Sequence, residues 1–351
     1  MRPRVRRAYR PESEFLWILA CAALLAGCAA RSSPATTKPA RETAEKAGPG
    51  SSGRPDFRWK GVELFGRRDI SREAILKDMP VEMGAPVDMQ ATNAVLQALT
   101  SWCRDLKEQH ALAFAECSFV AYADGRVYLT VDLVHPDEAY RLAYRPRPAG
   151  SAAVSEPGVF ELLGKLQSLT HQMLIDGRPA SEIWAGFLDY REPAPHEMAV
   201  ELSKRVPPLA DELLEVLDGE RDDRKRGQAA WLLYYSGNPP RAIREAAAHL
   251  DDPSSLVRNN LSRYLINVVG EIPDAQVRRS VVDALLVQLG RPSMSDRNKS
   301  LFALLELARA HEDTRRYIAE KGEPLIASVR DTSILANVRG PAEELLDLLE
   351  P

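Results

Sequence analysis

Residues 57–135 show the alternation and spacing of regular secondary structure. Apolar and polar side chains alternate over Trp59–Phe65, which predicts a half-buried strand. Ser71, followed by Glu73 and apolar residues at 74–76, is typical of the start of a short helix. Over Met89–Glu108 apolar residues recur at helical spacing, which predicts a longer helix with one buried stripe of Leu96, Leu99, Cys103 and Leu106.

A β-hairpin is predicted after these helices. Residues 117–122 form an apolar run, residues 123–126 supply a turn with Gly125, and residues 127–133 alternate again. The second arm therefore places Val127, Leu129, Val131 and Leu133 on one face. The order strand, helix, helix, strand, strand predicts a small α+β domain over residues 57–135.

The next segment, residues 136–194, is predicted to be a linker and a helical bridge. Proline and glycine interrupt residues 146–151 and 156–158, which indicates a hinge. Apolar spacing predicts a helix over residues 160–175 and a further helix over residues 183–190.

Residues 195–351 have helical periodicity throughout and contain a repeat. Asp252-Pro253 is followed by Val257-Arg258 and Leu261, and similar frames recur around Arg226, Asn298 and Arg339. The four markers are separated by 32, 40 and 41 residues, a range typical of paired-helix solenoids. The sequence therefore predicts an all-α solenoid behind the α+β domain.

The amino-terminal segment has the pattern of a secretory signal. Five arginines precede an apolar run over residues 15–25, which is shorter than the ~20 residues that a membrane-spanning helix needs. Residues 1–27 are thus expected to be a signal peptide. Residues 28–56 are rich in Ala, Ser, Thr, Pro and Gly without apolar periodicity, and are expected to be a disordered tether.

The end of the apolar run, Leu25-Ala26-Gly27-Cys28, resembles the lipobox of bacterial lipoproteins. This resemblance implies cleavage between Gly27 and Cys28 and attachment of lipid to Cys28. Acyl chains contribute roughly 0.8 kcal/mol per buried methylene, so they anchor a protein without a spanning helix. Ala29 stands where an Asp would imply retention in the inner membrane, so the resemblance points to the periplasmic face of the outer membrane.

The α+β domain resembles a POTRA domain, a periplasmic module of outer-membrane assembly factors and secretion transporters. The resemblance rests on the element order, on residues 62–71 with their Gly turn and Ile-Ser helix start, and on residues 84–88. Only Phe114 stands for the aromatic pair that usually precedes the second strand. The resemblance implies a sheet edge that binds client chains by β-augmentation. An unrelated α+β domain of the same order is the alternative.

The pattern Asp-Pro-x-x-x-Val-Arg-x-x-Leu at residues 252–261 resembles HEAT repeats, closest to the short HEAT-like class. The resemblance implies that Asp-Pro separates two helices, that apolar residues face the neighbouring repeat, and that the arginine bonds turn carbonyls or acids. A generic helical bundle is the alternative.

Composition limits the function classes. The net charge is −4, and the leader contributes five arginines against two glutamates, so the chain that follows it is more acidic. Such a chain lacks the concentrated basic footprint of a nucleic-acid-binding protein. The arginine clusters at residues 224–226, 278–279 and 315–316 are interleaved with acids, and we expect them to be solvated.

No catalytic, metal or cofactor site is predicted. The six histidines lack metal-ligand spacing, and neither a nucleophile elbow nor a phosphate-binding loop is present. Cys103 and Cys117 are expected near one end of the sheet, either as a disulfide or as two buried thiols. Tyr234, Tyr235 and Arg258 are candidates for contact with a partner on the solenoid surface.

These patterns favour a lipid-anchored, non-catalytic protein-binding scaffold or assembly factor of the cell envelope. Its expected partners are an envelope or secretion protein complex and the membrane, with no nucleic acid, metal or cofactor. The alternative is an enzyme or accessory subunit of an envelope complex, because some HEAT-like proteins are lyases. Residues 195–351 contain no cysteine, which a cofactor-attaching lyase would need.

Overall fold

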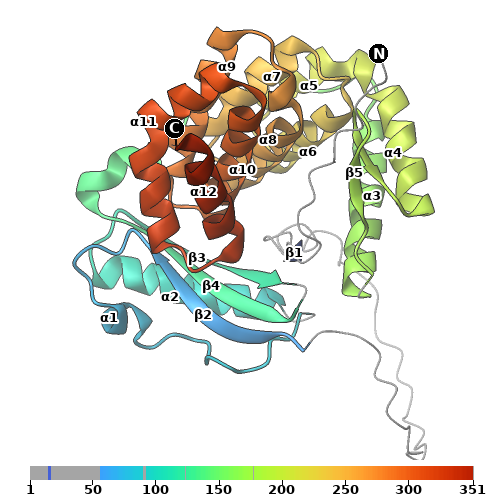
Figure 1. Cartoon of the computed structure of the whole chain (residues 1–351). Helices are drawn as coiled ribbons and strands as arrows, with labels where there is room; N and C mark the ends of the chain where they lie inside the picture. Colours follow the sequence, from blue (N-terminus) through green and yellow to red (C-terminus); the bar gives the residue numbers. More distant parts are fainter. Residues whose placement is uncertain (1–14, 17–55, 90–91, 123, 177, 351) are drawn as a thin grey trace, which may run out of the picture.

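The computed structural model describes residues 15–16, 56–89, 92–122, 124–176 and 178–350. Most of the expected signal peptide and tether, including Gly27 and Cys28, lies outside the described residues. Within the described residues, no helix is both long enough and apolar enough to cross a membrane. Figure 1 shows a small sheet with helices on one side of it and a curved stack of helices on the other.

The sheet has the predicted element order. Strands β3 (Phe114–Tyr122) and β4 (Arg126–Val134) form the expected antiparallel hairpin, and β2 (Arg58–Phe65) pairs with β4 in parallel. A two-residue strand, β1 (Phe15–Leu16), lies antiparallel on the outer edge of β3. The strand order is therefore β1-β3-β4-β2, with β4 in the interior.

Two helices cover one face of the sheet. The short helix α1 (Arg72–Leu76) begins where predicted, because the side chain of Ser71 accepts a hydrogen bond from the backbone N–H of Ala74. Helix α2 (Thr92–Gln109) buries the predicted stripe against the four apolar side chains that β4 presents on this face. Those four side chains, Val127, Leu129, Val131 and Leu133, are at most 1% exposed.

The bridge between the two parts differs from its prediction. After the 3₁₀ helix η2 (Pro136–Leu142), the chain is extended until α3 (Gly158–Ile175), which confirms the helix expected over residues 160–175. The helix expected over residues 183–190 is wrong. These residues form a hairpin of β5 (Glu182–Trp184) and β6 (Leu188–Tyr190), because Gly186 takes a positive φ of 84° and reverses the chain.

The rest of the described chain is helical. Its α-helices are α4 (Pro193–Arg205), α5 (Ala210–Gly219), α6 (Asp223–Leu232), α7 (Pro240–Ala248), α8 (Ser255–Val268), α9 (Ala275–Leu289), α10 (Met294–Ala310), α11 (Glu312–Thr332) and α12 (Ala336–Leu349). Short 3₁₀ segments, η3 (Pro207–Leu209), η4 (Leu233–Tyr235), η5 (His249–Asp251) and η6 (Val269–Glu271), join some of them.

The helices form two layers. Helices α6, α8, α10 and α12 pack side by side in an inner layer, and α5, α7, α9 and α11 follow one another in an outer layer (Figure 1). One continuous apolar core runs between the layers and extends to Val120 and Tyr122 of the sheet. The described chain therefore contains a helical-repeat solenoid, and the sheet packs against its inner layer.

Candidate functional site

Buried arginines join successive units of the solenoid. Arg226 of α6 donates from Nε and Nη2 to the carboxylate of Asp252, both at 3.0 Å, and from Nη1 to the carbonyl of Glu220 at 2.9 Å. Arg258 of α8 repeats this pattern with Asp296, at 3.0 and 2.8 Å, and with the carbonyl of Asp252, at 2.7 Å. Each guanidinium thus links its own turn to an acid of the next unit.

Arg278 of α9 makes a similar connection. It donates to the Thr314 hydroxyl at 2.9 Å and to the Asp313 carboxylate at 2.7 Å, both in the next outer helix, and to the carbonyl of Ile272 at 3.0 Å. We call Arg226, Arg258 and Arg278 with their acids the arginine ladder. The expectation that Arg226 and Arg278 are solvated is wrong, because these bonds allow both side chains to be buried.

The other two repeat markers depart from this pattern. Asn298 of α10 donates to the carbonyl of Asn337, which still connects two inner helices. Arg339 of α12 is exposed, and its side-chain bond within the described part of the chain is to Glu343 on its own helix, at 2.7 Å. The repeat frame therefore continues to the last helix, whereas the ladder does not.

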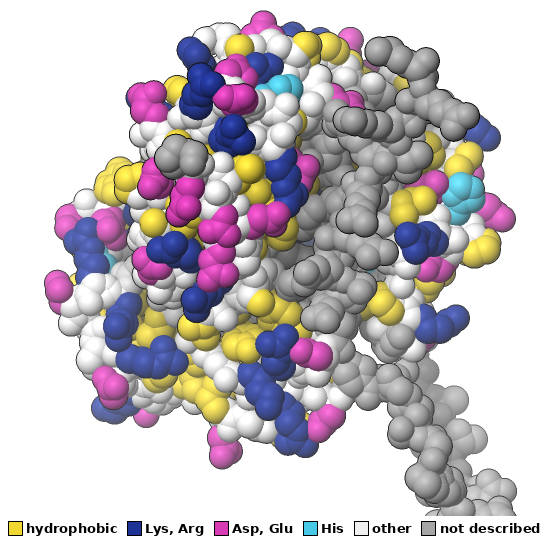
Figure 2. All heavy atoms as spheres, in the orientation of Figure 1, with side chains coloured by type: hydrophobic (Ala, Val, Ile, Leu, Met, Phe, Trp, Pro, Cys, Tyr) yellow, Lys and Arg dark blue, Asp and Glu magenta, His cyan; other side chains and the backbone are white. Residues whose placement is uncertain are grey.

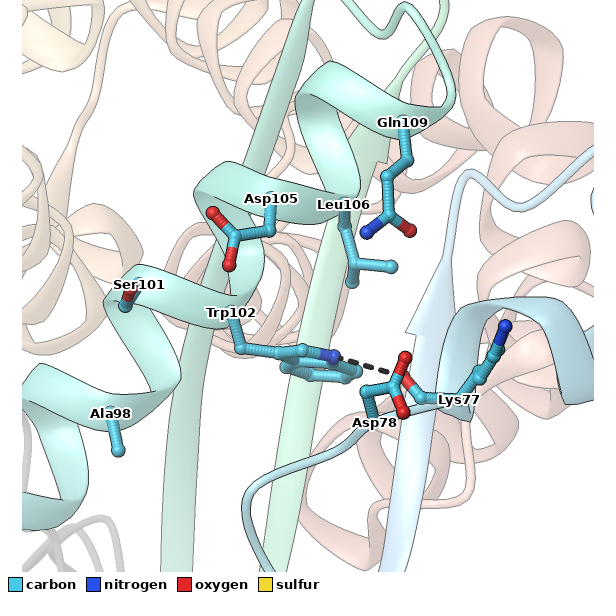
Figure 3. Close-up of a pocket in the computed structure, with 8 residues that line it drawn as sticks. All are labelled: Lys77, Asp78, Ala98, Ser101, Trp102, Asp105, Leu106 and Gln109. Atoms are coloured by element: carbon cyan, nitrogen blue, oxygen red, sulfur yellow. Dashed lines mark hydrogen bonds between the residues drawn. The ribbon is translucent and has the colours of Figure 1, made fainter.

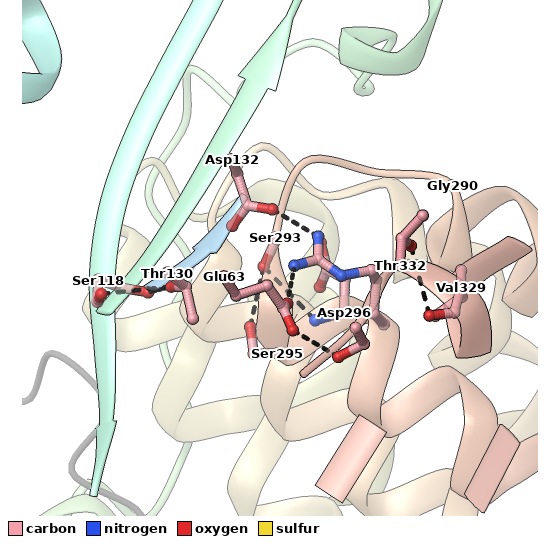
Figure 4. A network of polar contacts seen from close by, with 12 residues as sticks. Glu63, Ser118, Thr130, Asp132, Gly290, Ser293, Ser295, Asp296, Val329 and Thr332 are labelled. Atoms are coloured by element: carbon pink, nitrogen blue, oxygen red, sulfur yellow. Dashed lines mark hydrogen bonds and ion pairs between the residues drawn. The ribbon is translucent and has the colours of Figure 1, made fainter. Parts of the chain in front are cut away.

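The second face of the sheet packs against α10 and α12 through a buried cluster of charges. Arg297 of α10 donates to Asp132 of β4 at 2.5 Å and to Glu63 of β2 at 3.0 Å (Figure 4). Ser333 and the backbone N–H of Ile334 donate to the other oxygen of Glu63. We call Arg297, Glu63 and Asp132 the sheet–solenoid cluster; each residue is at most 2% exposed.

Within this cluster, burial and ion pairing have opposite effects on the pKa of Asp132. Removal from water raises the pKa of Asp132, and the adjacent guanidinium of Arg297 opposes this increase. The Arg297 guanidinium also lies 3.8 Å from the centre of the Phe65 ring. The paired charges thus give this contact a specific geometry, because an unpaired member would be strongly unfavourable here.

Further polar contacts accompany the cluster. The Tyr122 hydroxyl donates to Asn337 at 2.8 Å, and the hydroxyls of Ser118 and Thr130 share a hydrogen bond of 2.6 Å. Gly61 of β2 lies close to Ile334 and Tyr128, so an added Cβ there would meet both at 3.3 Å. Strands β2, β3 and β4 therefore all contribute to the contact with the solenoid.

The extended residues 143–156, which we call the strap, continue the contact along the solenoid. Arg145 donates to the Asp251 carboxylate at 2.6 Å. Farther along, the Glu220 carboxylate accepts a bond from the backbone N–H of Ala152 at 3.2 Å, and Ser155 donates to Glu212 at 2.8 Å. The expected hinge over residues 146–151 is therefore wrong, because these bonds hold the segment against successive solenoid turns.

Glu220 is the most heavily bonded acid of the strap contact. Its carboxylate accepts bonds from the backbone N–H of Asp222 and from the Lys225 ammonium, at 2.9 and 3.0 Å. These donors, with the N–H of Ala152, lower the pKa of Glu220 to about 2. The carboxylate is thus held in its charged form across the physiological pH range.

Tyr234 and Tyr235 lie in a buried aromatic cluster. Each is 1% exposed, and the Tyr234 ring centre lies 6.3 Å from that of Trp184 and 5.8 Å from that of Trp231. The β5–β6 hairpin packs over them, because Phe187 also contacts Tyr235. Their predicted role as partner-contacting residues is wrong, and the same holds for Arg258, which is 2% exposed within the arginine ladder.

Cys103 and Cys117 form a disulfide, which is the first of the two expected arrangements. Cys103 of α2 and Cys117 of β3 have Cα atoms 5.9 Å apart and are bonded through their sulfurs. The bond lies in the apolar core between α2 and the sheet. It ties the helix to the strand at the edge of the three-stranded part of the sheet.

A pocket of about 300 Å³ lies between α1 and α2 (Figure 3). Trp102 donates from Nε1 to the carbonyl of Lys77 at 3.3 Å beside it. The pocket is lined by Lys77, Asp78, Ala98, Ser101, Trp102, Asp105, Leu106 and Gln109. The pocket brings together none of the predicted site residues, and its mixed polar lining has no arrangement typical of a nucleophile with its base.

The solenoid and sheet surface seen in Figure 2 carries acidic and basic side chains side by side, with apolar side chains scattered among them. No group of three or more His, Cys, Asp or Glu among the described residues could hold a metal ion. One accessible feature that follows from the topology is the outer edge of β3, where the described chain supplies a strand neighbour only for Ala121 and Tyr122.

Comparison with known proteins adds little to this description. No family model matches the chain, and no curated protein matches it. Among solved structures, the chain is similar to a designed armadillo repeat protein, with 14% sequence identity and a TM-score of 0.34. That similarity covers 56% of this chain and 93% of the designed one. The fold itself defines the class: a helical-repeat protein with a small α+β sheet unit docked on its inner layer.

Proposed function

We propose that this protein is a periplasmic lipoprotein that acts as a non-catalytic protein-binding scaffold or assembly factor in the cell envelope. The lipobox-like sequence ending at Cys28 supports the anchor. Lipid on Cys28 would hold the folded part beside a membrane, and the resemblance favours the outer membrane. Its partners would be components of an envelope or secretion complex.

The topology of the sheet supports a POTRA-like unit. The sheet has the expected order, with β2 parallel and β3 antiparallel to the central strand β4, and α1 and α2 cover one face. The buried arginines with turn carbonyls and acids support HEAT-like repeats in the solenoid. A protein of this kind binds partners through a sheet edge and through its extended helical surface.

The single observation that carries the proposal is the outer edge of β3. Residues Phe114–Val120 of this strand have no strand neighbour on that side among the described residues. Backbone N–H and C=O groups on such an edge are a template for a strand of another chain. The second face of the sheet is already occupied by the solenoid, so the strand edges are the parts left for a partner. The start of the other edge strand, β2, already pairs with residues 84–87.

Photo-crosslinking in cells tests this function. A photoreactive amino acid at Ala115, on β3 and partly exposed, should give one dominant protein adduct, identified by mass spectrometry. The same amino acid at Val287, which is 62% exposed on the outer helix α9, is the matched control and should not give that adduct. Identical adducts from both positions, or labelling of small metabolites alone, would contradict the scaffold.

The anchor has a separate test. Cys28→Ser removes the sulfur that lipid attachment requires, so the variant should accumulate as unprocessed precursor or leave the membrane fraction. Immunoblotting of fractionated cells measures both outcomes. Normal processing and normal membrane retention of Cys28→Ser would refute the lipoprotein proposal.

A further inference from the structure

One carboxylate on the β3 edge lacks a partner. Glu116 is exposed and makes no hydrogen bond or ion pair in the described part of the chain. It lies directly opposite Asp132 in the register of β3 and β4. Two like charges at directly opposed positions destabilise a strand pair unless a cation compensates them. Asp132 has Arg297 as its cation, whereas Glu116 has none.

Within the described chain, no uncommitted positive charge acts on Glu116. By alternation along β3, its side chain lies on the same face as Val120 and Tyr122, which pack against the solenoid. The charged groups that act on it from the packed elements are Asp132 of β4, Arg258 of α8 and Asp296 of α10. The Arg258 guanidinium is already bonded to Asp296 and to a carbonyl, so it does not neutralise Glu116.

The titration of Glu116 reflects this environment. Although its side chain reaches solvent, partial removal from water raises the pKa of Glu116 to about 7, with Asp132 and Asp296 adding to the increase and Arg258 opposing it. A cation placed next to the carboxylate would reverse that shift. Glu116 is thus a carboxyl on a strand edge that ionises near neutral pH, and no cation among the described residues is bonded to it.

The short strand β1 shows in which direction a strand can pair with this edge of β3. The chain's own β1 pairs antiparallel with β3, with Phe15 opposite Tyr122 and Leu16 opposite Ala121. A longer strand in this register would continue along β3 toward Glu116. In such a strand, the residue opposite Glu116 would come six positions after the residue opposite Tyr122.

We propose that the β3 edge binds an antiparallel segment of a partner protein that has apolar residues opposite Ala121 and Tyr122 and a lysine or arginine opposite Glu116. This inference rests on the proposed function, because it specifies the partner of the same edge. The strand backbone supplies hydrogen bonds that are independent of sequence, and the basic residue supplies the selectivity.

Synthetic peptides that copy residues 12–23 of this chain serve as probes, with position 21 as Lys, Ala or Glu. Binding to the protein purified from the membrane fraction is measured by fluorescence anisotropy. Cross-strand pairs of opposite charge contribute roughly 0.2–1 kcal/mol, so the Lys peptide should bind up to about fivefold tighter than the Ala peptide, and the Glu peptide more weakly.

Variants of the exposed Glu116 provide the matched controls. Glu116→Gln should abolish the preference for Lys, and Glu116→Lys should reverse it in favour of the Glu peptide. With wild-type protein the preference should increase from pH 6 to pH 8, because Glu116 ionises in that interval. A Lys peptide with N-methylated backbone amides should not bind, because it cannot form the strand hydrogen bonds.

The outcomes separate this inference from the proposed function. If all three peptides bind equally and Glu116→Gln changes nothing, the charge selectivity is refuted and edge docking stands. If none of the peptides binds and Ala115 also gives no crosslinked protein in cells, the edge is not a docking site and both proposals are refuted.

Discussion

The two faces of the sheet are both buried, but different chemistry buries them. The face toward α2 is apolar, with Leu129 and Leu133 fully buried among aromatic and aliphatic side chains. The face toward the solenoid contains Glu63, Thr130 and Asp132, all at most 2% exposed. The first face gains stability from the hydrophobic effect. The second gains a defined orientation, because its charges require specific partners.

This difference explains how the sheet is fixed on the solenoid. An apolar contact tolerates small shifts, whereas a guanidinium shared between Glu63 and Asp132 does not. The strap then continues the same contact along the turns near Asp251 and Glu220. The sheet and the helical repeats therefore form one body, with the β3 edge held in a fixed position relative to the solenoid.

The largest expected effect comes from breaking the polar face. Arg297→Ala leaves Glu63 and Asp132 buried without a cation and should lower the free energy of unfolding by about 3–5 kcal/mol, measured by urea denaturation. The control is Arg316→Ala, an exposed arginine on α11 whose side chain is 78% exposed. That control should cost less than about 0.5 kcal/mol, and equal losses in both variants would refute the role of the cluster.

A substitution in the apolar face should lower the free energy of unfolding slightly less than Arg297→Ala does. Leu129→Ala removes a fully buried side chain and should lower the free energy of unfolding by about 2–5 kcal/mol. Unlike the loss in Arg297→Ala, this loss should be independent of salt concentration. Val287→Ala is the exposed control. A strong salt dependence of the Leu129→Ala loss would contradict the assignment of the two faces.

The disulfide stabilises only the apolar side of the sheet, where both of its cysteines lie. Replacing both Cys103 and Cys117 with Ser should cost about 3 kcal/mol in the chain-entropy model. Thermal unfolding with and without a reducing agent measures the effect. Reductant should destabilise the wild-type protein and leave the double variant unchanged; an unchanged wild-type protein would show that the bond does not stabilise the fold.

The smallest effect is expected at the strap. The pKa of Glu220 is lowered to about 2 in the folded protein, below its ordinary value of 4.5. Its contribution is therefore fully present above about pH 4.5 and is lost as the pH falls toward 2. Glu220→Gln should cost about 1.5 kcal/mol at pH 7 and flatten the decline of stability between pH 5 and pH 2. Parallel pH profiles of variant and wild type would contradict this.

The apolar side of the sheet could be predicted from the sequence because its period of two is visible in β4. The same alternation places Thr130 and Asp132 on the opposite face, but nothing local indicates which element covers that face. Asp132 meets Arg297 across 165 residues, and a single sequence does not reveal such a pairing. The hairpin around Gly186 was missed for a local reason, because its short apolar run fits a helix or a strand equally well.

The candidate site was predicted only in part. The repeat frame located Arg226 and Arg258 correctly, but their charge suggested a surface that their partners Asp252 and Asp296 in fact bury. Tyr234 was predicted to contact a partner on the solenoid surface, but it lies in the 3₁₀ segment after α6, where the hairpin after α3 covers it. The β3 edge could be anticipated from the element order, whereas the isolation of Glu116 depends on pairings made by other residues.

Hydrogen exchange measured by mass spectrometry tests the central claim most directly, namely that the sheet and the solenoid are one cooperative body joined through the polar face. In the wild-type protein, the slowest amides of β4 and of α8 should exchange with the same free energy of opening. In Arg297→Ala, β4 should exchange at a lower free energy while α8 keeps its protection. Separate opening of β4 in the wild-type protein, unchanged by Arg297→Ala, would contradict the account.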